Sequence, residues 1–473
     1  MFLPEGEGKS KENNDQTENL KNLSLSSSNE IITPMEALKK IYDNVQYHLN
    51  EETKQRIMLV DTHGHPHLQR DIQYANNGVS TDHTADVANT SSSQSSTEDE
   101  QSSHGTEIPQ KSNALSTYDD SLSSRFHQKG VVSLTCAISP QDWDAALEYA
   151  SQSPWILPAL GVHPWYLGDI LANNTAEISS SAANTPESSP QSNMMHLPTQ
   201  YLEMDWLTRL ETHLSQHPHI IVGEIGLCKM ARFVREFPSE KGGKAAALQL
   251  QKYVFRKQLE LAAKWSRPVT VHCVNMHGIF MEVMKDVLRA AKESIEDQDV
   301  DGGGAILQSQ LRKAFPPAIA MHSFTGTAHH AQEIMSFENQ LLHPEEVGDL
   351  GKRRKKKQTQ TKQEEPNNTK GDTAKDTLFY FGFSHIINHR MCTSEKARRK
   401  GMEAVRSIPA HRLLIESDVH SSEDVALGTA GALAYVAHVR GESIEDVAEQ
   451  TVSNGLHFLN SLGLTATLYG SSD

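Results

Sequence analysis

Eight short apolar segments alternate along this chain with longer segments of helical periodicity. Each apolar segment is rich in Val, Ile, Leu or Phe and has the length of a buried β-strand. The candidate strands are residues 57–61, 130–137, 156–161, 219–224, 268–272, 318–322, 378–384 and 412–418. Nearly continuous apolar strands that alternate with helices are typical of a parallel sheet buried on both faces. Eight such units predict an α/β fold, the closed (β/α)8 TIM-type barrel.

The segments between the strands predict helices. In residues 245–265 the apolar positions at helical spacing are Leu248, Phe255, Leu259 and Ala262. Their offsets of seven, four and three residues place them on one face of a helix. Further helices are predicted at 201–216, 277–292, 394–406, 424–440 and 443–461. A doubly wound open sheet is the alternative, but no Gly-x-Gly-x-x-Gly sequence follows the first strand, so the barrel is preferred.

Polar segments of low complexity interrupt this pattern. Residues 1–30 are predicted to be a disordered tail, and residues 31–473 a single barrel domain with insertions. The insertions lie at about 71–125, 171–198, 294–316 and 337–376. Because they hold few apolar residues, they cannot offset the entropy that ordering costs, and we expect them to be mostly disordered. The segment 294–316, acidic and glycine-rich at its start, is expected to be a loop.

The bulk composition excludes several classes of protein. The formal net charge is −16 and the mean hydropathy is −0.52. Neither a run of membrane-spanning length nor a basic start followed by an apolar core is present, so we expect no membrane anchor and no secretion. The four cysteines are widely spaced, which favours a reducing compartment, the cytoplasm or nucleus. The acidic balance argues against a protein that coats duplex DNA, but not against an enzyme that grips one phosphodiester.

Side chains able to bind metal ions follow five of the eight candidate strands. Active-site residues of (β/α)8 barrels lie at the carboxyl ends of the strands. Asp61-Thr62-His63-Gly64-His65 follows the first strand, and because side chains two apart in extended chain share a side, His63 and His65 can approach one ion. The further candidates are Glu224, His272, His322, Glu416 and Asp418. Imidazoles and carboxylates in such a set can hold one or two divalent metal ions.

These motifs resemble those of the TatD-type metal-dependent hydrolases, which are amidohydrolase-like barrels. The motifs are DTHGH at 61–65, GVHP at 161–164, GEIGL at 223–227, PVTVH at 268–272, HSFTG at 322–326, LLIESD at 413–418, and Asn454 ahead of His457-Phe458. Their order and spacing match once the insertions are removed, so the resemblance covers most of the ordered chain. The long polar insertions are similar to those of a fungal branch described as interacting with a subunit of the anaphase-promoting complex.

The resemblance implies a centre of two divalent metal ions, whether Mg²⁺, Mn²⁺ or Zn²⁺. The implied ligands are His63, His65 and Asp418 for one ion and His272 and His322 for the other, with Glu224 as the bridge. Asp418 would also orient or deprotonate the attacking water, so that Asp418 and Glu224 are the implied catalytic residues. A metal ion lowers the pKa of its bound water from about 15.7 towards about 7, and a carboxylate beside it can take the proton. His163 is either a substrate-contacting residue at the rim or a packed histidine.

The chain departs from the family's usual sequence near the substrate. Cys228 stands where the family usually has Asp, Val274 where it usually has Arg, and Val419 where a proline usually follows the final Asp. A guanidinium is a natural phosphate clamp, so its replacement by Val274 weakens the inference that DNA is the substrate. The cationic side chains of the next loop, which are either substitutes or solvated surface residues, are Lys229, Arg232 and Arg235.

Three functions are compatible with these features. The leading hypothesis is a metal-dependent hydrolase, a phosphodiesterase or deoxyribonuclease acting on DNA. The second keeps the hydrolytic chemistry but takes an ester, an amide or a small phosphoester. The third is a non-catalytic scaffold or regulatory protein with a protein partner bound through the insertions.

The insertions and the basic run each have two interpretations. Insertions 71–125 and 171–198 leave the barrel at its catalytic face, where they are either lids over the site or bystanders. The basic run 352–357 is either a nuclear import signal or a solvated stretch.

Overall fold

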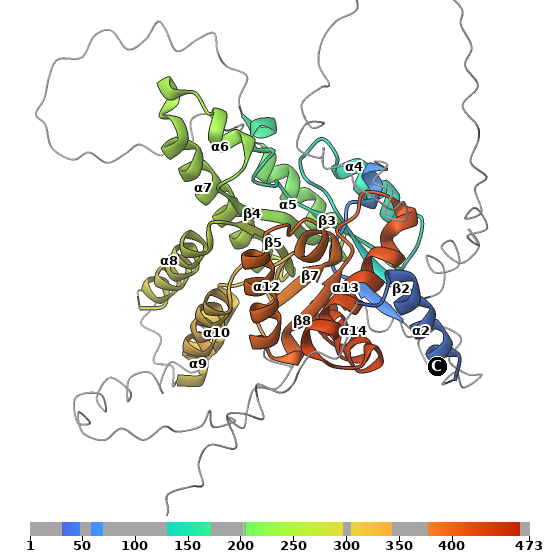
Figure 1. The fold of residues 1–473 in the computed structure, drawn as a ribbon. Helices are drawn as coiled ribbons and strands as arrows, with labels where there is room; N and C mark the ends of the chain where they lie inside the picture. Colours follow the sequence, from blue (N-terminus) through green and yellow to red (C-terminus); the bar gives the residue numbers. More distant parts are fainter. Residues whose placement is uncertain are drawn as a thin grey trace, which may run out of the picture.

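The computed structural model describes most of the predicted barrel. The described residues are 31–47, 58–69, 130–171, 202, 205–296, 304–342 and 377–463. The predicted tail at 1–30, nearly all of the insertions at 71–125 and 171–198, and the basic run at 352–357 lie outside them. Figure 1 shows the described elements in colour.

Eight parallel strands form the barrel in the order of the chain. They are β1 (Leu59–Asp61), β2 (Val131–Cys136), β3 (Ile156–Leu160), β4 (Ile221–Cys228), β5 (Val269–Val274), β6 (Ile319–Met321), β7 (Phe379–Ser384) and β8 (Leu413–Glu416). Each strand pairs in parallel with the next. The Thr62 amide donates to the Ile415 carbonyl at 3.2 Å, and this hydrogen bond joins the last strand to the end of the first. The predicted (β/α)8 fold is confirmed.

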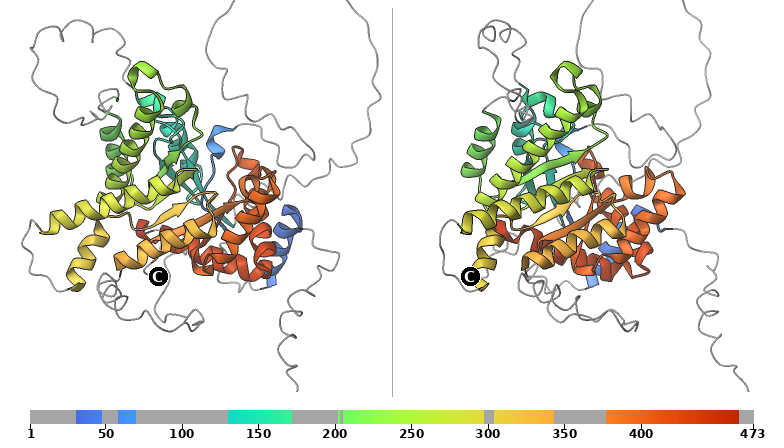
Figure 2. Two further views of the ribbon diagram at one scale, coloured as in Figure 1. Left: turned by 60° about the vertical axis from the view of Figure 1, so that its left-hand side comes forward. Right: turned by 90° about the vertical axis from the view of Figure 1, so that its left-hand side faces the viewer.

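Helices surround the strands on the outside (Figures 1 and 2). They are α2 (Pro34–Tyr47), α4 (Trp143–Ser151), α5 (Trp206–Gln216), α6 (Arg232–Glu236), α7 (Gly243–Lys264), α8 (His277–Glu296), α9 (Gly304–Lys313), α10 (Ala328–Leu342), α12 (Glu395–Ser407), α13 (Val425–Arg440) and α14 (Ile444–Leu459). Within the described part of the chain, none of them combines the length and the apolar character that crossing a membrane requires.

The structure differs from the predicted loops in two places. Residues 294–316 hold helix α9 rather than a loop alone, because Leu311 is buried and Leu307 packs against the core one helical turn earlier. Helix α10 continues to Leu342, so the insertion predicted from 337 begins later than expected. Phe337 and Leu341, four residues apart on α10, are both buried. In both places the helix has only a few apolar positions, and the surrounding sequence is polar, so its helical periodicity is weak.

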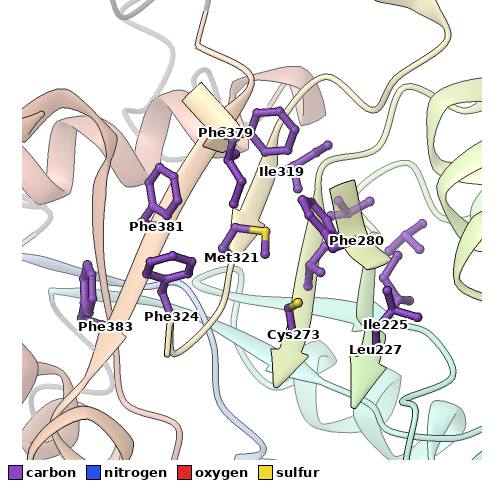
Figure 3. Close-up of a cluster of buried hydrophobic side chains, with 14 of the residues drawn as sticks. Ile225, Leu227, Cys273, Phe280, Ile319, Met321, Phe324, Phe379, Phe381 and Phe383 are labelled. Atoms are coloured by element: carbon purple, nitrogen blue, oxygen red, sulfur yellow. The ribbon is translucent and has the colours of Figure 1, made fainter. Parts of the chain in front are cut away.

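The strands separate two apolar layers because successive residues of a strand point to opposite faces. On β7, Phe379, Phe381 and Phe383 belong to the layer between sheet and helices, whereas Tyr380 belongs to a second cluster with Val132 of β2. Figure 3 shows the aromatic side chains of the outer layer. The second cluster fills the barrel with the alternate side chains of the strands.

A buried ion pair fixes the start of β7. The Arg412 guanidinium donates to the carboxylate of Glu338 on α10, which also accepts from the Leu378 amide at 2.6 Å. Removing one member of a buried pair leaves the other charge uncompensated, which costs about 3–5 kcal/mol. We therefore expect Glu338→Ala to lower the free energy of unfolding by about that amount in urea denaturation.

The matched control is the exposed pair of Arg232 with Glu236, 2.6 Å apart. Glu236→Ala should cost less than about 1 kcal/mol, because water and salt screen an exposed pair. Equal losses of unfolding free energy from Glu338→Ala and Glu236→Ala would show that burial of the Arg412–Glu338 pair adds nothing to stability.

Candidate metal centre

The end of β1 is fixed to the end of β8 by a buried carboxylate. Asp61 accepts from the Ser417 amide at 2.8 Å, from the Ser417 hydroxyl at 2.6 Å and from the His63 amide at 3.3 Å. Burial raises the pKa of Asp61 to about 8, against these hydrogen bonds. Asp61 thus positions the backbone of His63 and lies next to the site with a structural role.

Glu224 lies at the centre of the site and is 2% exposed. One carboxylate oxygen, Oε2, is 3.2 Å from Nε2 of His63 and 3.2 Å from Nε2 of His65. The atoms facing the other oxygen, Oε1, are His272 Nδ1 at 2.9 Å, His163 Nε2 at 3.2 Å and His322 Nε2 at 3.3 Å. Five imidazoles from four segments of the chain therefore converge on a single carboxylate.

Strand β4 carries Glu224 within its length rather than just beyond its end. The prediction placed the end of this strand at residue 224, but pairing with β5 continues from Ile225 to Cys228 after a register shift. Gly226 permits this pairing, since a Cβ there would lie 1.9 Å from the carbonyl oxygen of His272. Such close approach of two backbones requires glycine. The longer β4–β5 ladder brings His272 beside Glu224.

In His65 and His322, the hydrogen bond made by Nδ1 determines that Nε2 faces Glu224. His65 Nδ1 is 2.6 Å from the carbonyl oxygen of Cys136, and His322 Nδ1 is 3.1 Å from Glu416 Oε1. Both partners accept hydrogen bonds, so each Nδ1 carries a proton and donates it. The neutral rings then present the Nε2 lone pair to the carboxylate, the orientation that histidine ligands of metal ions adopt.

His163 has the opposite arrangement. Its Nδ1 accepts from the Trp165 amide at 3.2 Å, so in the neutral ring the proton is on Nε2. Nε2 then donates towards Glu224 Oε1, and burial lowers the pKa of His163 to about 4, which keeps the ring neutral. This geometry makes His163 a donor that orients Glu224, although its nitrogen also lies within a cluster able to hold an ion.

Asp418 enters the site from the segment after β8. Its Oδ2 accepts from the Ser323 hydroxyl at 3.0 Å, and its Oδ1 is 4.0 Å from His65 Nε2. The Asp418 amide donates to the His63 carbonyl at 3.0 Å, which ties the last strand to the first. Residues from opposite ends of the sequence thus share one edge of the barrel.

The charges in the site call for a cation. Burial favours neutral Glu224, yet the imidazoles around it hold the pKa of this carboxyl well below its ordinary value. Burial also favours neutral His322, but the nearby carboxylates, Glu224 first, raise its pKa well above its ordinary value. Burial opposes protonation of His272 as well, while Cys228 and Glu224 raise its pKa to about 9. Each shift favours positive charge beside Glu224.

The donor set fits divalent metal ions. Nε2 of His63 and Nε2 of His272 are buried without a hydrogen-bond partner, which is costly for polar atoms in an interior. In each of three clusters the ligand atoms lie within 4.8 Å of one another: His63, His65 and Glu224; His63, His322 and Asp418; His163, Glu224 and His272. Imidazole nitrogen and carboxylate oxygen suit Zn²⁺ and Mn²⁺ in particular.

The predicted site residues thus meet in one place. The structure groups them differently from the implied ligand sets, since His322 lies with His63 and Asp418. Sequence reasoning named Glu416 only as a strand-end residue and gave it no role, whereas its carboxylate orients His322. The sequence carries no local signal for this role, because the contact joins two residues that are 94 positions apart along the chain.

The loop after β4 offers no evident replacement for the Arg that Val274 displaces. Arg232 is exposed and paired with Glu236, and Lys229 and Arg235 are exposed. Val274 itself packs against the core. Cys228 is buried and its Sγ accepts from the indole nitrogen of Trp165 at 3.1 Å.

Comparison with known proteins relates this chain to one family. The family described as TatD-related DNase has a model that matches residues 60–340. Cut9-interacting protein scn1 of Schizosaccharomyces pombe is 23% identical over 350 residues, which cover 68% of this chain and 89% of the relative. The uncharacterized deoxyribonuclease YMR262W of Saccharomyces cerevisiae is 26% identical over 197 residues, or 39% of this chain and 63% of the relative.

Solved structures similar to this chain include two TatD proteins. YjjV, a TatD homologue from Escherichia coli K12, has a TM-score of 0.40 and 16% identity, and the match covers 72% of this chain and 92% of YjjV. A TatD-family hydrolase from Entamoeba histolytica has a TM-score of 0.43 and 11% identity, covering 85% of this chain and 98% of the other.

The family match spans more than half of the chain, from residue 60 to residue 340 of 473. It includes the five centre residues His63, His65, Glu224, His272 and His322, while Asp418 lies beyond it. The resemblance noted in the sequence is confirmed. This chain belongs to the TatD-related DNase family of hydrolases.

Proposed function

We propose that this chain is a divalent-metal-dependent phosphodiesterase that cleaves DNA. The observation that carries the proposal is Glu224, each of whose oxygens faces imidazole nitrogens on its own side. In their neutral form His65 and His322 direct Nε2 lone pairs at Glu224, and a bound cation would make these contacts favourable. Two cations flanking Glu224 would match a centre for phosphoryl chemistry, in which paired ions stabilise the attacking and leaving oxygens.

The ligands we assign are His63, His65, Glu224, His272, His322 and Asp418. When bound, the ions would neutralise charge on a phosphoryl oxygen and acidify water. Asp418 accepts the proton of the attacking water, and the Ser323 hydroxyl holds Oδ2 so that Oδ1 faces the site. Glu416 keeps the Nδ1 proton of His322 in place. His163 donates to Glu224 and fixes the orientation of its carboxylate.

Metal analysis of the purified full-length chain, followed by DNA hydrolysis assays, tests the proposal. We expect up to two Zn²⁺ or Mn²⁺ per chain and cleavage of an end-labelled oligonucleotide with Mg²⁺, Mn²⁺ or Zn²⁺ supplied. Protein without bound metal that leaves single- and double-stranded DNA intact with each ion would overturn it. Hydrolysis of a chromogenic ester or amide but not of DNA would favour the second substrate class, provided that Asp418→Asn abolishes it.

We also propose that the chain binds a protein partner outside the catalytic centre, in the cytoplasm or nucleus. The support is the name of the fission yeast relative, which describes an interaction with Cut9. A pull-down from cells should recover the same partners with wild type and with His63→Ala/His65→Ala. Loss of every partner in the double variant would instead place the binding surface at the metal centre.

A further inference from the structure

Large apolar side chains are exposed mainly around the catalytic face. Among the described residues, the exposed ones are Trp165 at 41%, Met230 at 50%, Met391 at 57% and Ile32 at 37%. Trp165 follows β3, Met230 follows β4 and Met391 follows β7, so three of the four stand on segments that leave the carboxyl ends of strands. This is the end of the barrel at which Glu224 and its histidines lie.

Trp165 is held in place at both its backbone and its side chain. Its amide donates to Nδ1 of His163 at 3.2 Å, and its indole nitrogen donates to Sγ of Cys228 at 3.1 Å. These bonds fix the edge of the indole ring, while the residue as a whole is 41% exposed. A ring already held in one orientation loses little conformational freedom when a ligand stacks on it.

The indole ring is also close to the centre. Its centroid lies 6.1 Å from that of the His163 ring, and His163 Nε2 is 3.2 Å from Glu224 Oε1. A group attached directly to a phosphate at the centre can therefore reach the indole. Such a group in a nucleic acid is a sugar with its base, and every base has a flat face that stacks on an aromatic side chain.

We propose that Trp165 is a stacking platform for the base beside the scissile phosphodiester. This inference rests on the proposed phosphodiesterase function and gives it a substrate class, an unpaired nucleotide at the cleavage point. The nucleotide must be unpaired because a base in a duplex already stacks on its neighbours.

The test compares two oligonucleotides in the hydrolysis assay, one with normal bases and one with an abasic residue beside the cleaved bond. Stacking of one base contributes about 1–3 kcal/mol by alanine substitution, so Trp165→Ala should lower kcat/KM on the normal substrate roughly 5- to 140-fold. On the abasic substrate wild type and Trp165→Ala should be alike. Trp165→Phe keeps a ring but not the bond to Cys228, and it should retain most activity.

Met391→Ala is the control, because it removes a more exposed apolar side chain from another loop of the same face. Binding is measured separately with a 2-aminopurine oligonucleotide and the Asp418→Asn variant, where stacking should quench the fluorescence unless Trp165 is also replaced. Equal losses on normal and abasic substrates would overturn the platform and leave the phosphodiesterase standing. Trp165-dependent quenching without any cleavage by wild type would leave the platform and overturn the phosphodiesterase.

Discussion

Asp418→Asn should lower the turnover number for DNA hydrolysis by about 100- to 10,000-fold, the contribution of a positioned general base. The amide keeps the size of the side chain and an acceptor for the Ser323 hydroxyl, but it cannot take a proton from water. Asp418 has a φ of +52°, and asparagine is one of the few residues that tolerate this conformation. The variant should therefore fold like wild type, and the loss should appear in kcat.

Asp205→Asn is the matched control, since Asp205 lies before α5 with an exposed side chain outside the centre. It makes the same chemical change and should leave kcat unaltered. Equal denaturation midpoints for wild type and Asp418→Asn would confirm that folding is unaffected. Activity of Asp418→Asn within a factor of about three of wild type would exclude Asp418 as the base, because a general base contributes at least about 100-fold.

Glu224→Gln should remove at least one metal ion per chain and reduce hydrolysis below detection. Glutamine has the same shape, but it is neutral and offers only one oxygen to the nitrogens that now face two. Loss of an outer hydrogen-bond partner of a ligand already weakens metal binding about 10- to 100-fold, so loss of the central carboxylate should exceed about 100-fold. Calorimetric titration of metal-free protein with Zn²⁺ or Mn²⁺ measures this affinity.

Glu416→Gln supplies the graded comparison. It replaces the charged acceptor of the His322 Nδ1 proton with a neutral amide oxygen, which accepts more weakly, while all proposed ligands stay in place. Its metal affinity should fall about 10- to 100-fold, less than for Glu224→Gln. If Glu224→Gln retains two ions and Glu416→Gln loses them, Glu224 is not the bridge and the assignment of the centre is wrong.

The barrel could be predicted because its signals are local. Short runs such as 378–384 and 412–418 show strand length and apolar content without reference to the rest of the chain. The first run contains the observed β7 and the second contains β8. Helix α9 was missed because its apolar positions, Leu307 and Leu311, are few and follow an acidic, glycine-rich stretch. Burial against the neighbouring helices, which the sequence does not display, stabilises it.

The candidate site could be predicted in membership but not in arrangement. Strand-end position brings His63 and His322 to one edge, because parallel strands of a barrel all end there. The role of His163 could not be read in this way. It depends on a hydrogen bond from the Trp165 amide, whose direction follows from the path of the loop after β3.

The sequence by itself determined the strand and helix order and the residue types at the catalytic edge, since periodicity and strand ends are properties of neighbouring residues. Only the tertiary structure decided which nitrogen each imidazole turns towards Glu224. A histidine's tautomer is set by the partner of its other nitrogen, and for His65 and His322 those partners, Cys136 and Glu416, are 71 and 94 residues away along the chain. The tautomer decides whether Nε2 has a lone pair for a metal ion or a proton for a hydrogen bond, and it depends on residues far away along the chain.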